Sequence, residues 1–242
     1  MTFLSELLAW FTDPLNWQGS SGIPIRTWEH VQYSVAATLI AALIALPIAL
    51  YLGHTGRGGL LAINIANIGR AIPSLGLIIM AFILLGLNIT PVMIALVALA
   101  IPPIVTNTYI GIRNVNREVR DAAGGMGMTG WQVLTQVEIP VAMPLIMAGL
   151  RTSAVQVVAT ATLAAYLSFG GLGRFLFDGL ALQDYEQLTG GALLIAALSL
   201  ITEFLLARVQ TVVVPKGLAK RNATAAVDAK MSGKAGVASS GA

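Results

Sequence analysis

Apolar runs long enough to cross a lipid bilayer are the feature that most constrains this chain. At about 1.5 Å per residue, the run from Pro91 to Gly111 covers the roughly 30 Å hydrocarbon core of a membrane. The five predicted spans are Val31–Leu52, Ile68–Leu87, Pro91–Gly111, Val141–Leu167 and Gly190–Val213. Of the 242 residues, 56% are hydrophobic and only 10% are charged, whereas soluble domains carry about 25% charged residues. The sequence therefore predicts an all-α, polytopic membrane protein.

Three regions follow from these spans. Residues 1–30 are predicted to form a lead-in outside the membrane, beginning with an amphipathic segment that is too short to span. Residues 31–213 form the transmembrane domain, and residues 214–242 form a tail without apolar periodicity that is predicted to be disordered. The segment Leu60 to Asn67 is interpreted as an interfacial lead-in; if it is a separate span, the chain gains a helix and the assignment of sides changes.

The distribution of lysine and arginine predicts the orientation. With the chain entering from outside, the inner side receives Arg57, Arg70, Arg113, Arg117, Arg120, Lys216, Lys220, Arg221, Lys230 and Lys234, and the outer side only Arg26 and Arg174. Positive residues concentrate on the cytoplasmic side of membrane proteins. The amino terminus is therefore predicted to be outside and the carboxyl terminus in the cytoplasm.

A long polar stretch, Asn114 to Arg151, interrupts the apolar runs on the inner side. Good helix formers and charges begin it, and four glycines then interrupt the pattern, each costing a helix interior about 1 kcal/mol relative to alanine. A second short helix is predicted from Thr129, a favourable N-cap. Pro140 either ends that helix or starts the next one at its first turn. The prediction for this stretch is therefore a short helix, a break at the glycines and a second short helix.

The residue spacing in this stretch resembles the EAA motif of ABC importer permeases: Glu-Ala-Ala, three residues, Gly, nine residues, Ile-x-Leu-Pro. The matching residues are Asp121, Ala122, Ala123, Gly127, Val137, Ile139 and Pro140, with Asp, Val and Ile as conservative replacements. In that family the loop docks onto a cytoplasmic ATPase. Small side chains on the loop favour close approach of a partner backbone, and Met128 and Trp131 are candidate apolar anchors. The alternative is an ordinary amphipathic surface loop.

Three further segments resemble the same family. Gly69–Leu75 is similar to the Ile-Pro segment of methionine-type and osmoprotectant permeases. Glu138–Arg151 and Gly170–Gly173 look most like the glycine betaine, carnitine and choline branch. This resemblance implies a bacterial cell (inner) membrane as the location, five core transmembrane helices and alternating access. It further implies an assembly with a second permease subunit, identical or different. It also implies two ATPase subunits, which carry ATP and Mg²⁺, and an extracytoplasmic substrate-binding protein. This chain itself has no phosphate loop and no cysteine.

Residues that are costly in lipid are candidates for a pathway or gate. They are Arg70, Pro73, Ser74, Pro102 and Pro103. Two further kinds of residue are candidates for other reasons: Tyr109 and Tyr166 lie well inside spans, where aromatic faces can hold a quaternary ammonium compound by cation–π attraction, and Gly170, Gly171 and Gly173 form an outer turn. Prolines free backbone carbonyls, and such breaks commonly line a path; their alternative is a kink that serves packing. The glycines predict a tight turn that forms a gate or a receptor-docking rim. The alternative there is a re-entrant structural loop.

Two charges lie deep within predicted spans. Arg151 and Glu203 each cost about 2.5 to 3.5 kcal/mol at a helix centre, so each requires a partner or an interface. They either pair with one another, or Arg151 extends to the cytoplasmic surface. His30 and His54 are interpreted as interfacial side chains rather than metal ligands, and no catalytic constellation is identified.

The sequence favours an osmoprotectant importer permease that is not itself an enzyme. Two alternatives remain open. One is a permease for methionine or another amino acid. The other is an ATP-independent channel or secondary transporter, for which Glu203 is the single clear acidic candidate.

Overall fold

The computed structural model describes residues 3–59, 63–64 and 73–214, and every element assigned within them is helical. Four of these helical segments are long and apolar enough to cross a membrane. They are α2 (Ile23–Thr55), α5 (Thr90–Arg113), the continuous helical stretch Gly130–Leu167 that contains α8 (Ile139–Thr160), and α10 (Tyr185–Val213). Four of the five predicted spans are thereby found, each within a helical stretch that reaches or extends past the predicted limits. The fourth ends in a 3₁₀ turn, η3 (Ala161–Leu167).

The second predicted span is described only in part. From Pro73 onward it contains α4 (Ser74–Leu85), a shorter apolar helix. Its beginning and most of Leu60–Asn67 lie outside the described residues, so the question of an additional span there stays open. The predicted disordered tail also lies outside them, except for Val214.

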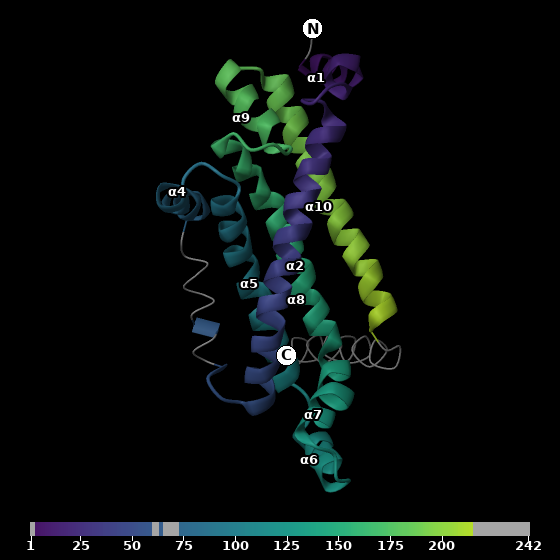
Figure 1. Ribbon diagram of the computed structural model, residues 1–242. Coiled ribbons are helices and arrows are strands. Elements are labelled where there is room, and N and C mark those ends of the chain that lie inside the picture. Colours follow the sequence, from purple (N-terminus) through teal and green to yellow (C-terminus); the bar gives the residue numbers. More distant parts are fainter. Residues whose placement is uncertain (1–2, 60–62, 65–72, 215–242) are drawn as a thin grey trace, which may run out of the picture.

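Short helices mark the two ends of the bundle (Figure 1). At one end, called here the α6 end, lie α6 (Arg117–Gly125), α7 (Gly130–Gln132) and the π-helical stretch η2 (Val133–Glu138). At the opposite end, the α9 end, lie α1 (Phe3–Thr12), the 3₁₀ turn η1 (Pro14–Trp17) and α9 (Gly173–Leu182). The long helices run between the ends, so residues far apart in sequence meet at each of them.

Helix α5 makes the most extensive contacts in the bundle, with α2 and with α8, which also contact each other. On α2, Ala37, Ala41, Ala45 and Ala49 recur every four residues and are fully buried. Residues four apart share one helix face, and small side chains there let two membrane helices approach closely. By contrast, only 6% of an apolar 18-residue stretch of α10 is buried within this chain.

Candidate functional site

The polar loop at the α6 end folds as helix, break, helix, as the sequence predicts. The Asn116 side chain caps α6 by accepting a hydrogen bond from the Glu118 amide at 2.8 Å. The helix ends in a turn at Gly127, whose φ of +85° is unfavourable for residues with a side chain. Thr129 then caps α7 and forms a capping box with Gln132. The chain stays helical beyond that point, so Pro140 lies in the first turn of α8 and does not end a helix.

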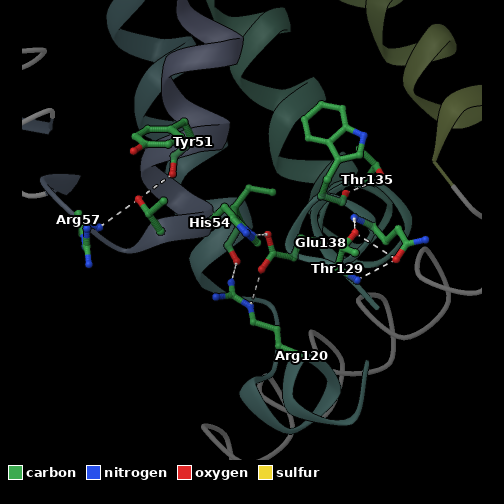
Figure 2. Close-up of polar contacts among 11 residues, drawn as sticks. Tyr51, His54, Arg57, Arg120, Thr129, Thr135 and Glu138 are labelled. Carbon is green, nitrogen blue, oxygen red and sulfur yellow. Dashed lines mark hydrogen bonds and ion pairs between the residues drawn. The ribbon is translucent and has the colours of Figure 1, made fainter. Parts of the chain in front are cut away.

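A buried carboxylate joins this loop to the long helices (Figure 2). The Glu138 side chain, at the end of η2, is only 1% exposed. Its Oε2 lies 2.7 Å from Nδ1 of His54 in the last turn of α2, and its Oε1 lies 3.1 Å from Nε of Arg120 in α6. The Arg120 contact is an ion pair without directed hydrogen-bond geometry. Because a carboxylate only accepts, the His54 Nδ1 donates the hydrogen.

Arg120 also binds the end of α5. Its guanidinium donates to the backbone oxygen of Ile112, in the last turn of that helix. Glu138, Arg120 and His54 are called here the Glu138 cluster. Through it, the ends of α2 and α5 are tied to α6 and η2. The cluster therefore links the loop to two of the long helices.

Sequence reasoning missed this cluster. His54 and Glu138 are 84 residues apart, and neither stands in a motif that points to the other. The available signal was a glutamate placed between the apolar Val137 and Ile139, where a charged side chain that becomes buried needs a partner. The prediction for His30 was wrong: its side chain is not interfacial but fully buried.

The EAA-like residues divide between the surface and the interior. Asp121 is exposed, and its Oδ2 lies 3.9 Å from Nε of Arg117. Three further residues of the motif region are also exposed: Ala122, Gly127 and Trp131. Met128, Val137, Ile139 and Pro140 are half-buried. Ala123, however, is only 2% exposed, so its methyl group packs within this chain and not on the surface. The sequence analysis also missed two exposed apolar side chains of the same loop, Met126 and Val119.

At the α9 end, the glycine-rich turn is held by α2. The Gly171 amide donates to Glu29 Oε2 at 2.8 Å, and the Leu172 amide to His30 Nδ1 at 3.3 Å. On its other side, His30 Nε2 donates to the Val158 backbone oxygen at 2.8 Å, which requires a neutral imidazole protonated on Nε2. Two backbone amides of the turn are therefore bonded to side chains of α2, and His30 links the turn through its other nitrogen to α8.

Glycine is required in this turn for steric reasons. A Cβ on Gly170 would lie 1.9 Å from the Glu29 carboxylate, and one on Gly173 would lie 2.1 Å from the Thr162 backbone oxygen. Gly171 has a φ of +86°. These contacts account for the glycines by packing alone, and the gate or receptor-docking role stays a prediction.

The predicted pathway prolines of α5 are buried between helices. Pro103 has no amide hydrogen for the Leu99 oxygen, and Gln156 Nε2 of α8 lies 3.4 Å from that oxygen instead. Ser153 donates to the Ala100 oxygen at 2.9 Å. Pro103 therefore lies in the α5–α8 contact, and both prolines are buried within this chain. At the other proline site, Pro73 is exposed and Ser74 half-buried at the start of α4, while Arg70 lies outside the described residues.

The structure does not bring the two candidate tyrosines together. Tyr109, in the last turns of α5 toward the α6 end, fills the space above Gly59. Tyr166, in η3 toward the α9 end, is 49% exposed, and its ring lies edge-on to that of Phe177, with the ring centroids 5.8 Å apart.

The two charged residues predicted to lie deep within spans, Arg151 and Glu203, do form a pair: the Arg151 Nε and Glu203 Oε1 atoms are 3.2 Å apart. Pairing is thereby confirmed over extension of Arg151 to the surface.

No three His, Cys, Asp or Glu side chains group as metal ligands in the described part of the chain.

Residues 18–217 match the family model described as binding-protein-dependent transport system inner membrane component. The chain is 38% identical to the glycine betaine/carnitine/choline transport system permease protein of Bacillus subtilis (strain 168), covering 80% of this chain and 89% of that protein.

Other relatives agree with this match. A carnitine transport permease protein of Listeria monocytogenes is 37% identical over 80% of this chain and 89% of its own length. Among solved structures, an inward-facing conformation of the MetNI methionine ABC transporter superposes with a TM-score of 0.71 at 19% identity, covering 84% of this chain and 100% of that chain, which shows a shared fold. By its helices, its loop and these matches, the chain belongs to the family of binding-protein-dependent transport system inner membrane components.

Proposed function

We propose that this chain is the membrane-spanning permease subunit of an ATP-driven importer for a small osmoprotectant such as glycine betaine, choline or carnitine. The observation that carries the proposal is the likeness to osmoprotectant permeases over about four-fifths of the chain. The EAA-like loop, anchored to the long helices by the Glu138 cluster, supports the ATP-driven part. The chain pairs with a second permease subunit, and two ATPase subunits hold the ATP and Mg²⁺.

The α6 end serves as the mechanical link in this proposal. It faces the cytoplasm, with the amino terminus outside, and its exposed side chains Val119, Met126 and Trp131 bind the ATPase. Closure of the ATPase dimer moves the loop. The Glu138 cluster passes that movement to α2 and α5, and the pore alternates between outward and inward openings. A separate receptor delivers the substrate to the α9 end.

The ATPase contact is tested by Trp131→Ala combined with Met126→Ala. Both side chains are more than 70% exposed and add little to the folded chain. The pair is expected to lower recovery of the ATPase in a pull-down from detergent at least about tenfold, because buried aromatic anchors at interfaces commonly contribute 2 kcal/mol or more. Trp28→Ala, an exposed tryptophan near the start of α2, is the matched control and is expected to retain the ATPase.

Transport separates the candidate functions. Proteoliposomes that contain this chain, its ATPase and its receptor are expected to import glycine betaine, choline or carnitine only when ATP is present. Import by this chain alone would contradict the proposal and favour a channel or secondary transporter. Import of methionine would keep the ATP-driven mechanism and replace the substrate.

A further inference from the structure

The ion pair of Arg151 and Glu203 lies deep in the membrane part of the bundle. Arg151 is two residues before Ser153, which bonds to Ala100 near the middle of α5. Its partner Glu203 lies well inside α10, and the Nε to Oε1 distance is 3.2 Å. Charged residues at such depth are costly in lipid, and almost always face the bundle interior or a water-filled cavity.

This pair is neither buried in the chain nor fully bonded. The Arg151 side chain is 31% exposed and the Glu203 side chain 42%. A guanidinium has five N–H donors and a carboxylate about four acceptor positions, yet within the described residues each group has the other as its one polar partner. The open positions on both groups need water or a polar solute. The face of α8 and α10 that carries them is therefore not a lipid-facing surface.

We propose that Arg151 and Glu203 form a transient binding site for a zwitterionic solute on the translocation path. The solute's carboxylate binds the Arg151 guanidinium and its ammonium group approaches the Glu203 carboxylate, as the two side chains part. This step rests on the proposed function and names the chemical class that the membrane part itself recognises. No covalent bond changes.

Charge balance explains why the pair suits a zwitterion. When a carboxylate and an ammonium group replace the mutual contact, both protein charges keep a partner of opposite sign, and the site stays neutral. A cation such as choline engages Glu203 alone and leaves the guanidinium unpaired at the membrane centre, which is costly. The paired state in turn closes the site when no solute is present.

Water access is tested first, because it does not depend on which substrate is carried. The chain has no cysteine, so a single introduced cysteine can be labelled without background. We expect Glu203→Cys in native membranes to react with a membrane-impermeant, charged thiol reagent, which requires a thiolate in contact with water. The matched control is Leu205→Cys, a position on α10 that is 62% exposed, more than the 42% of the Glu203 side chain, and is expected to stay unlabelled because it faces lipid. Failure to label Glu203→Cys in the folded complex would overturn the site.

Recognition of both charges is tested by substrate preference. In proteoliposomes with ATPase and receptor, Arg151→Gln is expected to lower glycine betaine import about tenfold more than choline import, since only glycine betaine presents a carboxylate. Glu203→Gln is expected to lower both. Arg151→Lys keeps the charge and should restore most of the preference for glycine betaine.

A purely structural ion pair gives a different result. Its loss would lower import of both solutes in the same proportion, and an unchanged ratio in Arg151→Gln would overturn this inference while leaving the proposed function intact. Gln210→Leu is the packing control, because it removes another polar contact between α10 and α8, the 3.4 Å bond to the Pro144 oxygen. It is expected to leave the ratio unchanged. A wild type that imports neither solute would overturn the proposed function, and this site with it.

Discussion

Glu138→Ala is expected to be among the most damaging single substitutions in this protein, lowering the free energy of unfolding by about 3–5 kcal/mol. The carboxylate is 1% exposed and is the acidic partner of both His54 and Arg120. Its removal leaves the half-buried His54 without its hydrogen-bond acceptor and the largely buried Arg120 without a counter-charge, and it leaves a cavity between η2 and α2. The ends of α2 and α5 then lose their common attachment to the loop.

This prediction is checked by denaturant unfolding of the detergent-solubilised protein. Glu118→Ala is the matched control, because that glutamate lies in the same loop but is exposed, and its removal is expected to change stability by less than about 0.5 kcal/mol. A double-mutant cycle of Glu138 with His54 then measures their interaction directly. An equally small effect for Glu138→Ala would show that the Glu138 cluster does not hold the loop.

Transport should be more sensitive than folding to the same cluster. With His54→Ala, Arg120 still joins α6 to η2 and to the end of α5, but the loop loses its bond to α2. We expect such a complex to keep hydrolysing ATP while importing less solute for each ATP consumed. Hydrolysis and import that fall together in the same proportion would indicate weaker docking of the ATPase instead.

The second large effect is expected for Gly173→Ala at the start of α9. The added Cβ would lie 2.1 Å from the Thr162 backbone oxygen and 2.8 Å from two further backbone atoms. Backbone cannot rotate away as a flexible side chain does, so η3 and α9 must separate. Overpacking of this kind costs about 1–3 kcal/mol, and the backbone contact places this case near 3 kcal/mol.

Thermal unfolding in detergent measures this second effect against Gly76→Ala. Gly76 also lies in a helix, but the nearest atom to its added Cβ, on Pro73, is 3.7 Å away. That control is expected to be neutral or to stabilise α4 by up to about 1 kcal/mol, since alanine is the better helix former. Equal behaviour of the two variants would contradict the close packing of η3 on α9.

The sequence by itself determined the features that depend on local pattern. Apolar length predicts the helical spans, because backbone in lipid must satisfy its own hydrogen bonds. Glycine spacing and the Thr129 N-cap predict the break between α6 and α7, because capping and φ preference act within a few residues. The EAA-like spacing predicts the family, which the comparisons confirm.

Only the tertiary structure decided which distant side chains meet. Helix packing brings His54 to Glu138 across 84 residues and His30 to Leu172 across 142, and no local pattern specifies either contact. It also placed Ala123 inside the chain, although its motif position suggested the surface, and chose the Arg151–Glu203 pair over extension of Arg151 to an interface. From the sequence, a charged side chain within a span is known only to need a polar partner, and a small side chain is known only to permit close packing. The packing of the helices determines which residue becomes that partner or neighbour.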